Sequence, residues 1–229
     1  MPIFHPRLTV IDSDETRRYA GLGRKADFSP ELLGEACTQA HLLSIPKGVW
    51  QVYTYDQDIH AIMAAEPLVL TTDSVVRHLY GAVEVAVMAV TIGLPLEQEV
   101  SNLFSHNKYA LGLLLDAAGT TAVETACDAV CNIIAQQAWR SGLTAGRRFS
   151  PGYGGWPIEA QPEILDLATG AAIGLSVTDT KMLVPRKSVT AIVGLYPYHQ
   201  TLSLPHQQTL PCDKCGQPSC HARKESTEP

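Results

Sequence analysis

Residues 148–157 read Arg148-Phe149-Ser150-Pro151-Gly152-Tyr153-Gly154-Gly155-Trp156-Pro157. The first proline fixes its own φ angle, and the three glycines permit backbone conformations that other residues rarely adopt. The arginine can bind a carboxylate through two parallel hydrogen bonds, while the tyrosine and the tryptophan offer flat apolar faces to a ring or a cation. Two interpretations fit this stretch, which we call the clamp: a ligand-binding turn, or a surface turn in which proline and glycine commonly gather.

The region before the clamp is rich in helix signals. Ser29 is a suitable cap and Pro30 a suitable first residue for a helix that should run to about Leu43. A second helix should begin near residue 72 and continue toward Gly93, so that the apolar run 81–96 becomes a buried core helix. Three further helices are expected, over residues 97–104, 108–118 and 122–139, the last of them introduced by two threonines.

Strand signals are fewer and lie mainly after the clamp. Residues 188–195 alternate as a β-strand does, and residues 52–55, 67–71 and 175–177 are candidate partners, since a lone strand leaves its edges unpaired. A short helix should cover residues 162–168. The sequence therefore predicts an α+β fold in which a helical N-terminal part packs with a mixed or antiparallel twisted sheet. The expected domain spans 1–202, with a helical lobe to about 140 and the clamp and sheet over 141–202, followed by a tail, 203–229.

Composition limits the classes of function. The chain has 229 residues, of which 45% are hydrophobic and 17% charged, so it can bury a sizeable core. Its net charge of -6 disfavours general nucleic-acid binding. The apolar run 81–96 is shorter than the roughly 20 residues of a membrane span, and no signal peptide is evident at the start. Together with six cysteines, this pattern predicts a cytoplasmic protein that associates with neither membrane nor nucleic acid.

The order Arg-Phe-Ser-Pro-Gly-Tyr, then Trp-Pro, then Gln161 resembles the reactivation domain of cobalamin-dependent methionine synthase. The similarity continues in the same order and spacing through residues 173–178, Met182, Pro185 and residues 187–190. A looser match upstream involves residues 15–19, 77–79 and 91–93. The chain is thus similar to this family most strongly in its C-terminal half.

The resemblance implies a binding site for S-adenosylmethionine. Arg148 would pair with the ligand carboxylate, and Glu124 would receive its ammonium group. The backbone around Ser150 and Gly152 would bond the adenine edge or the ribose, and Tyr153 would supply packing and a hydroxyl. Another interpretation of the acid is that Glu124, with an aspartate one turn later, only decorates the favourable N-terminal end of a helix.

The resemblance also implies a freestanding reactivation subunit. Such a subunit supports the reductive methylation of cob(II)alamin on a separate cobalamin-dependent methionine synthase, with an electron from a donor such as a flavodoxin or a ferredoxin. It would be a methyltransferase component that is not self-sufficient. Cobalamin is expected on the partner, because the chain's nearest approach to the carrier motif Asp-x-His-x-x-Gly has Met63 in place of the glycine. No catalytic residue is assigned, since positioning the methyl group is the main task.

The cysteines fall into two groups. Cys127 and Cys131 lie one helical turn apart on an apolar stripe, which predicts a packing role. Cys212, Cys215 and Cys220, near the C-terminus, have the spacing of a site for zinc or an iron–sulfur cluster, although a reduced, mobile tail fits the same residues.

Three other functions remain open at this point. The chain would serve equally well as the reactivator of another corrinoid methyltransferase, because S-adenosylmethionine is the same ligand in both. It would also fit a noncatalytic S-adenosylmethionine-binding module, which binds without methyl transfer, or a metal-binding interaction protein that depends on the cysteine tail.

Overall fold

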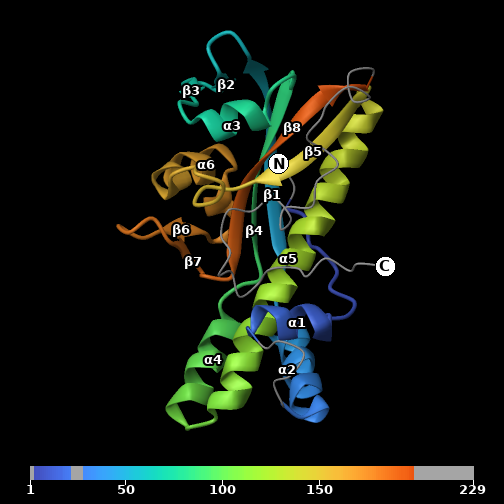
Figure 1. Ribbon diagram of the computed structural model, residues 1–229, viewed down its shortest axis with the longest axis vertical. Helices are drawn as coiled ribbons and strands as arrows, with labels where there is room; N and C mark the ends of the chain where they lie inside the picture. Colours follow the sequence, from blue (N-terminus) through green and yellow to red (C-terminus); the bar gives the residue numbers. More distant parts are fainter. Residues whose placement is uncertain (1–2, 22–27, 199–229) are drawn as a thin grey trace.

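The computed structural model describes residues 3–21 and 28–198, and within them it forms an α+β fold around a six-stranded antiparallel sheet (Figure 1). The strand order is β3-β2-β1-β4-β8-β5. These strands are β1 (Lys47–Asp56), β2 (Ala61–Met63), β3 (Leu68–Val69), β4 (Glu84–Thr91), β5 (Leu143–Phe149) and β8 (Ser188–Pro197). A separate hairpin joins β6 (Ser176–Val177) to β7 (Leu183–Val184). The predicted fold class is confirmed.

Helices cover both faces of this sheet. One face packs against α5 (Tyr109–Arg140), with α1 (Ser13–Tyr19), α2 (Pro30–Leu43) and α4 (Pro95–Ser105) gathered around the first half of α5 (Figure 1). The other face carries α3 (Asp73–His78), α6 (Gln161–Leu167) and two short 3-10 turns, η1 (Ile158–Ala160) and η2 (Gly170–Ile173). Successive residues of β4 enter opposite cores, with Ala86 and Met88 on the α5 side and Val85 and Val87 on the α3 side.

The predicted helix over residues 81–96 is wrong, because β4 occupies the middle half of that range. This strand is central in the sheet and is buried on both faces, so it shows a continuous apolar run instead of the alternation of a half-exposed strand. A short apolar run of that kind cannot be distinguished from a buried helix by periodicity. The helix that begins near residue 72 ends at His78, and Pro95 begins α4 where the sequence suggested an end.

The two helices expected over 108–118 and 122–139 form a single helix, α5. The threonines between them do not interrupt it, because each hydroxyl bonds a carbonyl of the preceding turn: Thr120 to Asp116 at 3.3 Å and Thr121 to Ala117 at 3.4 Å. The helix over residues 30–43 is confirmed, with the Ser29 hydroxyl accepting the Leu32 N–H at 3.2 Å. The packing role of Cys127 is also confirmed, since its side chain is fully buried in the core.

The strand over residues 188–195 is confirmed as part of β8, but its neighbours differ from those expected. It pairs with β4 and β5, whereas residues 52–55 and 67–71 lie elsewhere in the same sheet and residues 175–177 contribute to the separate hairpin. Strands β1 to β4 precede residue 140, so the helical lobe and the sheet interleave along the chain. The proposed tail from residue 203 lies outside the described residues. In the part of the chain that the structure describes, no helix has the length and apolar character needed to cross a membrane.

Candidate functional site

Arg148 lies near the end of β5, an edge strand of the sheet, just after an irregularity in its pairing. Ala145 is opposite Leu195 and Arg148 is opposite Val193, so the strand has one more residue than its partner over this interval. Such a β-bulge bends the strand and changes the direction of the side chains around it. The backbone of β5 therefore sets where the Arg148 guanidinium points.

The Arg148 guanidinium faces two acids of α5. Its Nη2 donates to Glu124 Oε2, and its Nη1 lies 3.6 Å from Asp128 Oδ1, which is too far for a hydrogen bond. Nη1 is buried and has no hydrogen-bond partner among the described residues. Because a buried donor without an acceptor costs free energy, this end of the guanidinium is suited to bind an acceptor from a ligand.

Burial and charge act in opposite directions on Arg148. Burial alone would lower its pKa, but Cys127, Glu124 and Asp128 around it raise the pKa above the ordinary arginine value. The side chain is 25% exposed, against 34% for Glu124 and 72% for Asp128. The arginine is therefore a permanent cation at the edge of solvent, with one acid bound to it and a second acid nearby.

Glu124 lies in the interior of α5 and not at the start of a helix as the sequence suggested, because α5 begins at Tyr109. A favourable interaction with the helix N-terminus thus does not account for this residue, since that effect fades within the first turn. Helix α5 places Glu124 and Asp128 one turn apart, where both reach Arg148.

Helix α1 packs against α5 and forms a further side of the candidate site. The Thr16 hydroxyl lies 3.1 Å from the Thr121 hydroxyl in a buried contact that fixes α1 on α5. The Arg18 guanidinium stacks over the Tyr19 ring at 4.1 Å from its centroid. Burial raises the pKa of Tyr19, and the nearby Glu124 carboxylate raises it further. Tyr19 therefore lies near the Arg148–Glu124 pair, and the sequence pointed to it only through the loose match over residues 15–19.

The clamp is a turn that its own backbone closes. The N–H of Gly152 donates to Trp156 O at 2.8 Å, and the N–H of Trp156 donates to Tyr153 O at 2.8 Å. Gly152 has φ +86°, a conformation that a side chain would strain. Because the N–H of Gly152 bonds within the turn, a ligand would use its carbonyl. The Ser150 carbonyl accepts the N–H of Tyr153 at 3.3 Å.

The two aromatic flanks of the clamp differ in role. Tyr153 is 71% exposed, so its ring faces solvent, and its contact with a ligand stays a prediction. Trp156 is only 4% exposed and stacks on Phe149, with ring centroids 5.8 Å apart and ring planes 4° apart. The expectation that Trp156 offers a face to a ligand is therefore wrong: this side chain anchors the turn in the core.

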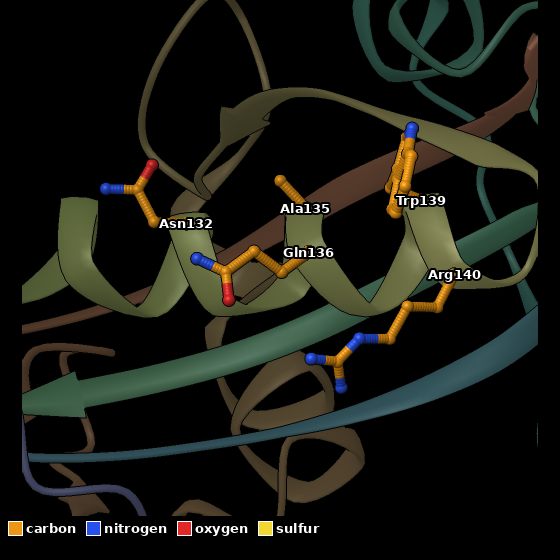
Figure 2. A pocket seen from close by; sticks show the side chains of 5 residues that line it. All are labelled: Asn132, Ala135, Gln136, Trp139 and Arg140. Carbon is orange, nitrogen blue, oxygen red and sulfur yellow. The ribbon is translucent and has the colours of Figure 1, made fainter.

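One other candidate site among the described residues lies apart from this arrangement. A surface hollow of about 520 Å³ lies farther along α5, and Figure 2 shows its polar side chains with the Trp139 ring; it is lined by Asn132, Ala135, Gln136, Trp139 and Arg140. None of the predicted ligand residues lines it. In residues 3–21 and 28–198, no cluster of three metal-binding side chains occurs. The predicted metal ligands Cys212, Cys215 and Cys220 lie outside the described residues.

Comparison with known proteins supports the fold. No protein-family profile matches the sequence, and no curated protein matches it. Among solved structures, the fold is similar to the crystal structure of the MetH reactivation domain bound to AdoHcy, with a TM-score of 0.56 and 14% sequence identity. The aligned region covers 86% of this chain and 79% of that chain. At this identity the likeness establishes a fold relationship with that domain.

Proposed function

We propose that this protein binds S-adenosylmethionine and acts as a reactivation subunit for a separate cobalamin-dependent methionine synthase. The observation that supports this most is the buried Nη1 of Arg148, which has no hydrogen-bond partner among the described residues although an acid already holds Nη2. A cation with one bound acid and one unsatisfied donor suits a ligand that brings a carboxylate.

The paired acid makes the site selective for a zwitterion. The Arg148–Glu124 pair must open, at least in part, for a ligand carboxylate to reach both guanidinium nitrogens. A ligand with only a carboxylate would leave Glu124 without its cation. An α-amino acid group satisfies both, because its carboxylate takes Arg148 and its ammonium group takes Glu124 or Asp128. The ligand is therefore inserted into an existing ion pair.

The clamp supplies the rest of the ligand contacts. Gly152 and Ser150 present backbone carbonyls near the start of the turn, where hydrogen bonds to the adenine amino group or the ribose hydroxyls are available. The exposed Tyr153 ring offers a face to the adenine ring or to the sulfonium cation. This chain holds and orients the ligand. The reaction then needs an encounter of two partners, the ligand-bound chain and the corrinoid protein, instead of three separate molecules.

The chemistry of this proposal needs a partner. The methyl group leaves the sulfonium for reduced cobalt on a separate protein, with one electron from a flavodoxin or ferredoxin, and AdoHcy remains in the site. The resemblance in sequence and the fold shared with the AdoHcy-bound MetH reactivation domain support this assignment. A reactivator of another corrinoid protein would use the same residues, so the docking partner distinguishes the two.

Calorimetric titration tests the binding step. S-adenosylmethionine is titrated into the full chain, into Arg148→Ala and into Arg140→Ala, a control that removes an exposed arginine on the same side of the sheet. We expect binding by the wild type and the control, and a loss of about 1.5–3 kcal/mol in Arg148→Ala, the size of a hydrogen bond to a charged group. Equal affinity in a folded Arg148→Ala variant would refute the site.

A second measurement tests the reaction. A cobalamin-loaded methionine synthase that lacks its own reactivation domain is mixed with this chain, labelled S-adenosylmethionine and an electron donor, and methyl transfer to cobalamin is measured. Transfer supports the proposed function. Binding without transfer to this or any other corrinoid protein would assign the chain a noncatalytic binding role instead.

A further inference from the structure

Tyr196 is a buried residue near the end of β8, and it packs against the bulged interval of β5 that precedes Arg148. Its ring lies across two glycines: a Cβ atom built on Gly146 of β5 would lie 2.8 Å from the Tyr196 ring, and one on Gly194 would lie 2.6 Å from its hydroxyl oxygen. Both distances are shorter than real contacts allow, so the ring occupies space that only glycine leaves open. Gly146 belongs to the bulged interval of β5.

Tyr196 connects this bulge to α3. Its hydroxyl donates to the backbone carbonyl of His78, the last residue of α3, at 2.6 Å. The His78 ring in turn places Nε2 2.9 Å from the carbonyl of Arg147, where the nitrogen acts as the donor because a carbonyl only accepts. The same ring stacks on Phe149 with centroids 4.9 Å apart and planes at 22°. His78 thus contacts both sequence neighbours of Arg148.

Contacts from Tyr196 and His78 matter most where β5 bulges, because its pairing with β8 is irregular there. The bulge shifts the register of β5 against β8 between Ala145 and Arg148, and within residues 3–21 and 28–198 no strand pairs with the other edge of β5. Residues 146 and 147 therefore lie between two stretches of regular pairing with β8. Small changes there would turn the Arg148 guanidinium away from Glu124, since a bulge determines side-chain direction.

We propose that Tyr196 and His78 are positioning residues that hold the β5 bulge, so that Arg148 faces Glu124 and recognises the ligand carboxylate. This inference rests on the proposed function, because the ligand is the one proposed above. It assigns the two residues an effect on carboxylate recognition alone, through the backbone of β5 and without contact with the ligand.

The test compares two ligands and three conservative variants. Tyr196→Phe removes one hydroxyl, and His78→Phe keeps an aromatic ring on Phe149 but removes the donor to Arg147. Tyr53→Phe is a matched control, because the Tyr53 hydroxyl also bonds a backbone carbonyl, that of Leu167 at 2.7 Å, on the same side of the sheet and away from β5. The ligands are S-adenosylmethionine and its decarboxylated analogue, which differ only in the carboxylate.

Tyr196→Phe and His78→Phe should each weaken S-adenosylmethionine binding about 5-fold, the effect of losing one hydrogen bond that holds the β5 bulge. Both variants should bind the decarboxylated analogue as tightly as the wild type does. Tyr53→Phe should leave both affinities unchanged. An equal loss for both ligands, or no loss for S-adenosylmethionine, would overturn the inference, because a purely structural role does not discriminate between the ligands.

A measurement without ligand separates this inference from the proposed function. Hydrogen–deuterium exchange of peptides from residues 146–156 should be faster in Tyr196→Phe and His78→Phe than in the wild type and Tyr53→Phe. If the wild type binds no S-adenosylmethionine, the proposed function fails, and faster exchange still supports the positioning of the bulge. Exchange that matches the Tyr53→Phe control would overturn the positioning role whatever the ligand does.

Discussion

Glu124→Gln should change affinity in opposite directions for two ligands that differ only in their ammonium group. In the structure Glu124 accepts a hydrogen bond from Arg148, and in the proposed complex it receives the ligand's ammonium group instead. The substitution removes the negative charge from both interactions and keeps the shape of the side chain. For S-adenosylmethionine the loss of the ammonium contact dominates, whereas for the deaminated analogue only the release of Arg148 remains.

The magnitudes follow from these two contributions. A hydrogen bond from an ammonium group to a carboxylate contributes about 1.5–3 kcal/mol. Opening the Arg148–Glu124 pair costs about 0.5–1 kcal/mol, since both side chains are partly exposed. The difference predicts that S-adenosylmethionine binds Glu124→Gln more weakly by about 1–2 kcal/mol, which is roughly 5- to 30-fold. The deaminated analogue should bind about 2- to 5-fold more tightly.

Competition calorimetry with both ligands measures the two affinities on one protein. Glu99→Gln is the control, because Glu99 is partly exposed on α4 and accepts a hydrogen bond from the Asn102 amide, away from the site. Parallel weakening of both ligands would refute the ion-pair exchange and would mean that Glu124 acts through the fold. Unchanged S-adenosylmethionine affinity would remove Glu124 from the site.

Further predictions concern the clamp, the core and the thiols. Gly152→Ala places a side chain at φ +86°, which should cost about 1–2 kcal/mol of stability and weaken S-adenosylmethionine binding, as thermal unfolding and calorimetry would measure. Gly119→Val should destabilise the fold by about 1–3 kcal/mol and leave ligand affinity unchanged, because its Cβ would lie 2.6 Å from the buried Leu96 side chain; a change in affinity would contradict this separation. Burial raises the pKa of Cys131 from its ordinary value of 9.0 to about 11, so the folded state keeps a proton that the unfolded state loses. The free energy of unfolding should therefore fall as pH rises from 9 to 11 in denaturant titrations, and Cys131→Ala should reduce that slope.

Local signals in the sequence predicted the parts of the fold that local interactions determine. The cap at Ser29, the strand that becomes β8 and the fold class were predictable from spacing and composition. The central strand β4 was not, because burial on both faces removes the alternation that identifies a strand. The continuity of α5 was not predictable either. Its threonines suggested a break, but their hydroxyls bond carbonyls of the same helix.

The same division applies to the candidate site. Arg148 and the turn after it were identifiable because charge, proline and glycine lie together in sequence. The resemblance placed Glu124, and the structure puts it in direct contact with Arg148. Tyr196 carried no signal, since an aromatic residue in a buried strand is an ordinary packing residue, and His78 entered only through the loose match over residues 77–79. Their role becomes visible only where β5, β8 and α3 meet.

In the proposed function, the site on β5 must be reached by the corrinoid partner while this chain holds the ligand, and a place at the sheet edge suits that task. In the proposed reaction, the methyl group must reach cobalt on a partner while this chain still holds the rest of the ligand. A site in the middle of the sheet would have strands on both sides, whereas β5 pairs with β8 alone in the part of the chain that the structure describes. An open edge also invites unwanted pairing with other strands, and a bulge is a common protection against it. In the proposed site, the bulge before Arg148 would therefore have two effects at once: it would turn the guanidinium toward Glu124, and it would make the edge less suitable for strand addition.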